Sequence, residues 1–329
     1  MRKEGKIFIS TATFPWYNQA YEEHLLQNGG DRMILYLWQN QQTVVLGRHQ
    51  NAWREVQLDK LSQDGGFLAR RISGGGAVYH DLGNLNFTFL MPRQDYDLPR
   101  QLGLILTAVR SLGVDANFSG RNDLEIAGRK FSGNAFCLKK ERAMHHGTIL
   151  FASDFGRLGQ YLSPSVEKMR AKGVSSVHAR VVNLNKYAPG LNQEQLIDAL
   201  CAAFRAVYDA PPPQYVDTQQ AAPAALYQKY SAWEWRLGAS PAFETELSHR
   251  FAWGEFQLCL NSEQGRIANA TVYSDAMDAE LIERIRLALP GLPWRGSSLQ
   301  AALLSLAQNN AEAETLQALT AWLAEEVAY

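Results

Sequence analysis

The chain has 329 residues, 46% of them hydrophobic and 20% charged, which fits a soluble globular protein with one large and one small domain or two of middling size. A formal net charge of −1 removes any general attraction to nucleic acid or to an anionic membrane, so we expect neither as a partner. No apolar stretch is long enough for a secretory signal or a membrane span, and the three scattered cysteines favour neither a disulfide framework nor a zinc site, so we expect a cytoplasmic protein.

The first part of the chain combines short strands with one helix. The pattern predicts a strand in KIFIS and a helix that begins at Pro15 and ends at Asn28-Gly29-Gly30. Two β-branched and aromatic runs, ILYLWQN and TVVLGR, are separated only by polar residues and are expected to pair with each other. FLARRI and AVYH then flank a glycine loop as strand, loop and strand.

The spacing of apolar residues changes after the glycine loop. NLNFTFLM alternates apolar and polar residues, which indicates a half-buried strand with one polar face. Apolar residues from Leu98 to Leu112 fall on one side of a helix that Gly113 ends. A hairpin with its turn at Ala127-Gly128 follows, and then the strand HGTILFA.

The last third of the chain begins with a helix that Asn192 and Gln195 cap as a capping box. Residues 209–225 are rich in proline and alanine and are predicted to be surface coil. A hairpin that turns at residues 263–265 then precedes three helices, which is enough for a small second domain. We therefore place one domain at residues 1–243 and a C-terminal accessory domain at residues 244–329.

The stretch RRISGGGAVYHD carries the strongest chemical signal. Its three glycines can adopt positive φ and expose backbone N–H groups to a ligand, and Arg70 and Arg71 add permanent charge, which suits phosphate or carboxylate. The loop lacks the Lys-Ser or Lys-Thr of a Walker A motif, and it leads into a strand, which disfavours a Rossmann loop. The alternative is a wide turn with solvated arginines.

A second polar cluster lies in GRNDLEIAGRKFSGNAF. Lys130 follows the predicted hairpin turn, and Asn122 and Asp123 stand at the start of the preceding strand. A carboxylate and a lysine that face each other across a hairpin often form only a surface ion pair. If the hairpin folds over the glycine loop, Lys130 would neutralise charge on a transferring phosphoryl group and Asp123 would hold Mg²⁺.

His145 and His146 are neighbours on a predicted strand, so their imidazoles point to opposite faces and cannot easily share a metal ion. We expect one of them beside the ligand, with the hydroxyl of Thr148 in the same cleft. Residues 167–184 carry basic side chains among small ones and form either a solvated loop or a basic lid that orders on a polyphosphate or an adenylate.

Together these segments resemble the lipoate–protein ligases of the bacterial two-domain type. RR-x-SGGGAVYHD-x-GN is the most specific signature, and SGRNDL, GRKFSGNA, HHGTIL and SAWEWRLG follow in the order of that family. The resemblance implies an α+β fold in which a large mixed or antiparallel sheet flanked by helices forms the catalytic domain, with a small α/β accessory domain after it. It also implies that ATP activates lipoate to lipoyl-AMP, and that the lipoyl group passes to a lysine of an apo lipoyl domain.

The resemblance and the chemistry of the residues together give the expected site. Lys130 is the expected catalytic residue, and Asp123 the expected Mg²⁺ ligand. The residues expected to bind ATP or the adenylate are Arg71, Ser73, Gly75, Gly76, Ala77, Val78, Tyr79, Asn122, Lys130, Thr148 and Arg180. Those expected to bind lipoate are Trp38, Val45, Arg71, His80, Lys130, Gly133 and His146.

The same resemblance implies ATP and Mg²⁺ as cofactors and lipoate as a substrate. The implied acceptors are the lipoyl domains of 2-oxoacid dehydrogenase complexes and the H protein of glycine cleavage, and we expect a monomer. Two alternatives stay open: an octanoyl or lipoyl transferase that uses no ATP, with Cys137 as its nucleophile, and a non-catalytic protein that binds lipoate or a nucleotide.

Overall fold

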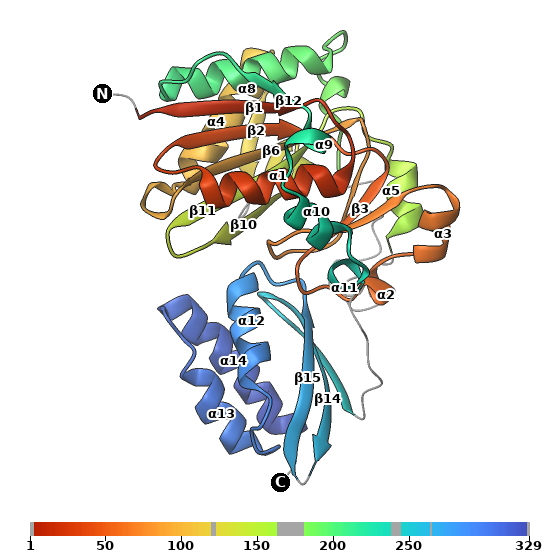
Figure 1. Cartoon of the computed structure of the whole chain (residues 1–329), viewed down its shortest axis with the longest axis vertical. Coiled ribbons are helices and arrows are strands. Elements are labelled where there is room, and N and C mark those ends of the chain that lie inside the picture. The colour runs from red at the N-terminus through yellow and green to blue at the C-terminus, as the bar shows by residue number, and fades with distance from the viewer. Residues whose placement is uncertain (1–2, 120–122, 163–180, 238–244, 264, 328–329) are drawn as a thin grey trace. The chain divides into compact units, whose positions relative to one another are not determined.

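The computed structural model describes residues 3–119, 123–162, 181–237, 245–263 and 265–327. The chain divides into two compact units, and many of their elements are labelled in Figure 1. The first comprises Met1–Leu46, Ala52–Arg71 and Ala77–Leu237, and the second joins Gly238–Tyr329 to two short segments, Gly47–Asn51 and Ile72–Gly76. The predicted boundary between residues 243 and 244 lies outside the described residues and stays a prediction.

A six-stranded mixed sheet forms the centre of the first unit. Strand β1 runs parallel to both of its neighbours, and the other neighbouring strands are antiparallel. The expected mixed sheet is confirmed. In spatial order the strands are β10 (Asn134–Leu138), β11 (Arg142–Leu150), β6 (Asn84–Pro92), β2 (Met33–Trp38), β1 (Gly5–Ser10) and β12 (Gln214–Val216).

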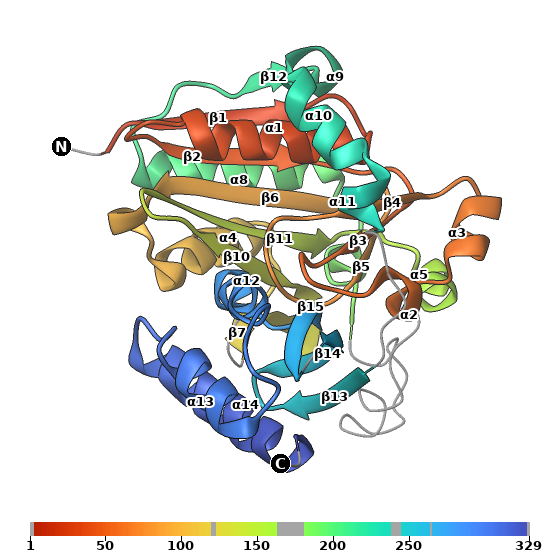
Figure 2. The same ribbon diagram turned by 60° about the horizontal axis from the view of Figure 1, so that its bottom comes forward.

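Helices cover both faces of this sheet (Figure 2). α4 (Leu98–Ser111) and α8 (Gln193–Val207) share a hydrophobic core with one face, and α1 (Pro15–Asn28) packs on the other. The predicted capping box of Asn192 and Gln195 is confirmed at the start of α8. Because β6 lies between two strands and under helices on both sides, all of its residues are buried, so the prediction that it is half-buried is wrong. Its polar face is nevertheless real, and it faces α1.

A second sheet has the order β4 (Phe67–Arg70), β3 (Thr43–Leu46), β5 (Val78–His80). The predicted pairing of ILYLWQN with TVVLGR is therefore wrong: the first run supplies β2 of the large sheet, and the second supplies β3 of this one. Three short helices share a hydrophobic core with this sheet: α2 (Ala52–Glu55), α3 (Leu58–Gln63) and α5 (Phe155–Tyr161).

A third sheet consists of β7 (Ala116–Ser119), β8 (Asp123–Ile126) and β9 (Arg129–Ser132). The predicted turn between β8 and β9 is confirmed, with φ of 50° at Ala127 and 73° at Gly128. Positive φ at both central residues is the geometry of a type I′ hairpin turn. It places Lys130 next to Glu125 and close to the start of β8.

Residues 209–225 are not simple coil, contrary to the prediction. They contain β12, which extends the large sheet beside β1, and α9 (Thr218–Ala221). α10 (Ala224–Ser231) and α11 (Trp233–Arg236) follow, and the described part of the first unit also contains the short 3₁₀ turns Arg93–Asp95 and Leu184–Lys186.

The second unit has a three-stranded antiparallel sheet and three helices around a core of its own. The predicted hairpin and helices are confirmed, and the strand before the hairpin was not predicted. Among the described helices, none is both long and apolar enough to cross a membrane. The elements are β13 (Thr245–Phe251), β14 (Gly254–Glu263), β15 (Arg266–Ser274), α12 (Ala279–Ala288), α13 (Gly296–Leu304) and α14 (Asn310–Glu326).

Candidate active site

Arg71 leaves the small sheet at the end of β4. Its backbone N–H donates to the carbonyl of Leu46 at 3.0 Å, and Nη1 donates to the carbonyl of Val45 at 3.2 Å. Burial lowers the pKa of the Arg71 guanidinium to about 10, while Glu22 acts in the opposite direction, so Arg71 stays charged at neutral pH. Arg70 is buried as well, so the alternative of two solvated arginines is wrong.

The glycine loop, Ile72–Gly76, contacts the C-terminal part of its own unit. Gly75 has φ of +89°, and its N–H donates to the carbonyl of Ala276 at 3.0 Å. A side chain at Gly74 would collide with the carbonyls of Ala276 and Met277. Of the three glycines only Gly75 has the predicted positive φ, and its amide is bonded within the protein in this conformation. Phosphate binding by this loop stays a prediction.

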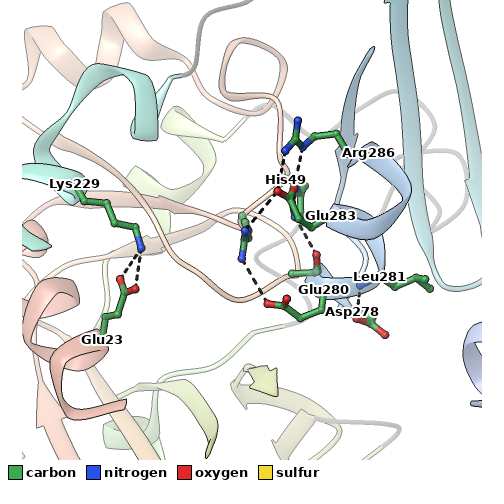
Figure 3. A network of polar contacts seen from close by, with 10 residues as sticks. Glu23, His49, Lys229, Asp278, Glu280, Leu281, Glu283 and Arg286 are labelled. Atoms are coloured by element: carbon green, nitrogen blue, oxygen red, sulfur yellow. Dashed lines mark hydrogen bonds and ion pairs between the residues drawn. The ribbon is translucent and has the colours of Figure 1, made fainter. Parts of the chain in front are cut away.

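The neighbouring segment, Gly47–Asn51, is held in the same unit. The N–H of Arg48 donates to the carbonyl of the buried Ser73 at 2.9 Å. The Nε2 of His49 is 3.0 Å from the carbonyl of Ala279, and Glu283 pairs with Arg286 at 2.9 Å (Figure 3). The contact of His49 joins Gly47–Asn51 to α12, and the hydrogen bond from Arg48 joins that segment to the glycine loop; the sequence predicted neither contact.

Trp38 begins a chain of hydrogen bonds under α1. Its Nε1–H donates to Thr88 Oγ1 at 3.0 Å, and that hydroxyl donates to Glu22 Oε1 at 2.6 Å. The same carboxylate oxygen is 2.9 Å from Nδ1 of His146. The residues come from β2, β6, α1 and β11, and all are buried. Glu22 was not predicted as part of the site, because the sequence around a carboxylate in a helix does not indicate that its partners come from distant strands.

His80 ends β5 and lies next to Trp38, with 6.2 Å between the ring centroids. Its Nδ1 is 3.3 Å from the amide nitrogen of Asn40, so Nδ1 accepts and Nε2 carries the proton. Burial, and then the charges of Arg71 and His146, lower the pKa of His80 to about 3, which keeps the ring neutral. Nε2 is buried without a hydrogen-bond partner among the described residues, so it is a donor available to a ligand.

Lys130 forms a second group on the hairpin of β8 and β9. Its Nζ is 2.7 Å from Oδ1 of Asp123, and both side chains are about one third exposed. A side chain at Gly133 would lie 3.0 Å from Lys130 Nζ, and the N–H of Gly133 donates to Thr148 Oγ1 at 3.3 Å. Lys130 therefore lies beside Asp123 and Gly133, and Gly133 lies beside Thr148, while their roles toward a ligand stay predictions.

A magnesium ion fits this group in part. Among the residues that the structure describes, no three His, Cys, Asp or Glu side chains could hold a metal ion by themselves. Mg²⁺ at a nucleotide site usually takes only one or two protein carboxylates, together with phosphate oxygens and water. The carboxylate of Asp123 can meet that requirement, with Lys130 as its partner in this conformation.

Strand β11 connects the two groups. His146 and Thr148 are two residues apart and share one face of the strand, whereas His145 faces the opposite side and contacts Gln101 and Asn134 at 3.1 and 2.8 Å. The prediction that the two histidines point apart is confirmed. Two predicted residues, Asn122 and Arg180, lie outside the described residues.

Three other predicted residues offer mainly their backbone. Tyr79 is buried in a small hydrophobic core beside Tyr161, so a nucleotide would meet its main chain and not its ring. Ala77 and Val78 directly precede Tyr79, and Val78 is the first residue of β5. Cys137 is 4% exposed on β10, where its thiol is closed to a substrate. A surface hollow lined by Lys3, Asp95 and Tyr208 contains none of the predicted site residues.

Comparisons with known proteins show the family to which the chain belongs. The Lipoyl protein ligase A/B catalytic domain family matches residues 15–205, and the Bacterial lipoate protein ligase C-terminus family matches residues 240–323. Lipoate-protein ligase A of Psychrobacter cryohalolentis is 39% identical over 334 residues, covering 98% of each chain.

Two solved structures are similar in fold and sequence. P. falciparum LipL1 in complex with lipoate has a TM-score of 0.88 and 27% identity, covering 98% of this chain and 99% of its own. A lipoate-protein ligase A bound with ATP has a TM-score of 0.62 and 27% identity, covering 71% of this chain and 99% of its own. The family match over residues 15–205 and the 39% identity along almost the whole chain show that this protein belongs to the lipoate–protein ligase family and is a ligase enzyme.

Proposed function

We propose that this protein activates lipoate with ATP to lipoyl-AMP and pyrophosphate, and then transfers the lipoyl group to one lysine of an apo lipoyl domain. The observation that carries the proposal is the buried group of Trp38, Arg71 and His80, in which one imidazole N–H has no partner among the described residues. Lipoate bound to LipL1 and ATP bound to lipoate-protein ligase A support the same reading.

Lipoate binds with its apolar tail along Trp38 and Val45, both of which are almost completely buried. Its carboxylate needs donors in that apolar setting, because an unpaired buried charge is costly. The guanidinium of Arg71 and the Nε2–H of His80 supply charge and a directed hydrogen bond. His146 lines the same side, held by Glu22.

In the first step an oxygen of the lipoate carboxylate attacks the α-phosphorus of ATP, and the bond from that phosphorus to the pyrophosphate oxygen breaks. Two anions approach each other, so the site must supply positive charge and hydrogen-bond donors. Arg71 and Lys130 provide the charge. Ser73, Gly75, Gly76, Ala77 and Val78 line the nucleotide with backbone groups, which requires Gly75 to exchange its present acceptor, Ala276, for the ligand.

In the second step the amine of the acceptor lysine attacks the lipoyl carbonyl carbon. The bond to the phosphate oxygen breaks, AMP leaves, and the amine loses a proton to solvent. Lys130 stabilises the negative charge that develops on the carbonyl oxygen and on the leaving phosphate. No covalent enzyme intermediate is needed, because the mixed anhydride is already reactive.

The remaining parts of the proposal concern cofactor, partners and organisation. Asp123 holds Mg²⁺, which neutralises phosphate charge when it is bound. Residues 1–243 form the catalytic domain and 244–329 the accessory domain of a cytoplasmic monomer. Its acceptors are lipoyl domains of 2-oxoacid dehydrogenase complexes and the H protein of glycine cleavage.

A transferase that uses Cys137 and no ATP is the alternative. The burial of Cys137 opposes it, because a thiol nucleophile has to reach its substrate. The full chain with ATP, Mg²⁺ and lipoate but no acceptor separates the two readings by mass spectrometry of the products. Lipoyl-AMP and pyrophosphate are expected, also from Cys137→Ser. No adenylate in this assay, together with loss of acyl transfer by Cys137→Ser in a second assay that contains an acyl donor and an acceptor lipoyl domain, would support the transferase.

A further inference from the structure

Arg70 bonds to α11 through both its side chain and its main chain. Its Nε donates to the carbonyl of Trp235 at 2.8 Å, and its Nη2 donates to the carbonyl of Arg236 at 2.9 Å. In return the indole Nε1–H of Trp235 donates to the carbonyl of Arg70 at 2.8 Å. Arg70 is 7% exposed, so this reciprocal pair is formed in the interior of the first unit.

The pair closes the open edge of β4. Among the described strands, β4 pairs only with β3, in parallel, and alternate residues of a parallel strand direct their N–H and C=O groups to opposite sides. Leu68 and Arg70 therefore direct their carbonyls to the edge that no strand covers. Two indoles satisfy them: Trp16 Nε1–H donates to Leu68 at 2.9 Å, and Trp235 donates to Arg70.

Neighbouring side chains hold the two indoles in place. Lys229 Nζ lies 4.5 Å from the ring centroid of Trp235 and donates to both carboxylate oxygens of Glu23, at 2.7 and 2.9 Å (Figure 3). The guanidinium carbon of Arg236 lies 4.6 Å from the ring centroid of Trp16. The edge of β4 is thus fastened to α1, α10 and α11 together.

We propose that Arg70 and Trp235 are positioning residues for Arg71. They fix the last residue of β4, and so the position from which Arg71 continues the parallel hydrogen-bond pattern by donating its N–H to Leu46 before the glycine loop begins. The proposal rests on the proposed function, in which Arg71 contacts the lipoate carboxylate. Arg70 and Trp235 touch no substrate and act only through Arg71.

The test compares Trp235→Phe with Trp16→Phe in the full chain. Both changes remove one indole donor to a carbonyl of the same strand edge, two residues apart, so a purely structural role predicts similar effects from both. The Michaelis constants for lipoate and ATP, kcat for pyrophosphate release, and the melting temperature are measured. Trp235→Phe is expected to raise the KM for lipoate about tenfold with a smaller change in kcat, and Trp16→Phe to change it less than about twofold.

Arg70→Met and Arg70→Lys provide the second comparison. Methionine is unbranched like the arginine side chain up to the position of Nε but carries no donors, and it is expected to behave as Trp235→Phe does. Lysine keeps one charged donor and is expected to restore part of the affinity for lipoate. Should Trp235→Phe fail to fold, this pair carries the test.

Equal changes of the KM for lipoate in Trp235→Phe and Trp16→Phe, or no change in either, would overturn the positioning role. Arg71→Gln separates this failure from a failure of the proposed function. An unchanged KM for lipoate in Arg71→Gln contradicts the role of Arg71 itself. A raised KM there, with an unchanged KM in Trp235→Phe, contradicts only the positioning role.

Discussion

Glu22 of α1 and His146 of β11 meet in the interior of the first unit, with 2.9 Å between Oε1 and Nδ1, although 124 residues separate them in the sequence. The same oxygen accepts the hydroxyl of Thr88, which in turn accepts the indole N–H of Trp38. A single buried carboxylate therefore orients two of the residues that we expect to bind lipoate, and it is the natural starting point for mutation.

Glu22→Ala should both destabilise the protein and weaken lipoate binding. It leaves the Thr88 hydroxyl and Nδ1 of His146 buried without their acceptor, which costs about 2 kcal/mol of unfolding free energy. We expect the KM for lipoate to rise about tenfold. Glu22→Gln keeps an acceptor oxygen of the same reach and should recover most of both losses. Urea unfolding and steady-state kinetics measure the two effects, and equal behaviour of Ala and Gln would count against an orienting role.

Lys130→Ala should remove formation of lipoyl-AMP, by at least about 100-fold in kcat, because it removes positive charge from the reacting phosphate. The fold should hardly change, since the ion pair with Asp123 is one third exposed and such pairs contribute at most about 1 kcal/mol. Lys186→Ala, at an exposed lysine of the first unit, is the matched control. If Lys130→Ala forms the adenylate at the normal rate, Lys130 is not the catalytic residue.

Trp38→Ala should weaken the binding of lipoate more than the binding of ATP. The indole is buried at the head of the proposed tail site, so its loss is expected to raise the KM for lipoate at least about tenfold and that for ATP less than about twofold. Loss of stability is measured separately by thermal unfolding, because truncating a buried tryptophan typically costs about 3–5 kcal/mol. Equal increases of the KM for lipoate and the KM for ATP would show that the lipoate tail does not bind at Trp38.

Gly75→Val should lower the affinity for ATP, because a β-branched residue resists the φ of +89° at this position. Gly113→Val is the matched control: Gly113 has φ of +82° in the turn after α4, so the backbone strain is similar, but it is not a predicted site residue. Calorimetric titration with ATP compares the two variants. Similar affinity for ATP in both would show that the loop does not bind phosphate.

Stability should fall as the pH falls below about 6.5. Burial, and to a smaller extent neighbouring charges, lower the pKa of His80 and of His145 to about 3. In the unfolded chain histidine titrates near 6.5, so between pH 6.5 and 3 the unfolded state binds protons that the native state does not, and the native state loses stability. At pH 5 each histidine accounts for a loss of about 2 kcal/mol.

His145→Gln tests this contribution, because glutamine does not titrate. The variant is expected to be less stable than the parent at pH 7.5, since it alters buried hydrogen bonds to Gln101 and Asn134. Its unfolding free energy should nevertheless fall about 2 kcal/mol less between pH 7.5 and 5. Parallel pH profiles for the two proteins would contradict the low pKa of His145.

Local signals in the sequence predicted most of the elements. The capping box of Asn192 and Gln195 and the turn at Ala127-Gly128 appear in the structure where the sequence placed them, because short-range hydrogen bonds and backbone preferences determine them. The two histidines of β11 point apart for the same local reason, the twofold repeat of a strand.

Long-range features could not be predicted in this way. ILYLWQN and TVVLGR both have the composition of a β-strand, and the residues around them do not indicate that they belong to different sheets. Glu22 and Arg70 look like surface charges until the buried groups opposite them are known, His146 in one case and the carbonyls of α11 in the other. The hydrogen bond from Gly75 to Ala276 joins residues 201 positions apart. The sequence therefore could not predict that the N–H of Gly75 has an acceptor within the protein.

The ATP-dependent ligation is tested by the mass of an apo lipoyl domain incubated with the purified full chain, lipoate and Mg²⁺, with and without ATP. We expect one lipoyl group to be added to one lysine only when ATP is present, and Lys130→Ala to abolish the addition. Lipoylation of the same domain without ATP, or none with it, would contradict ATP-dependent ligation by this protein.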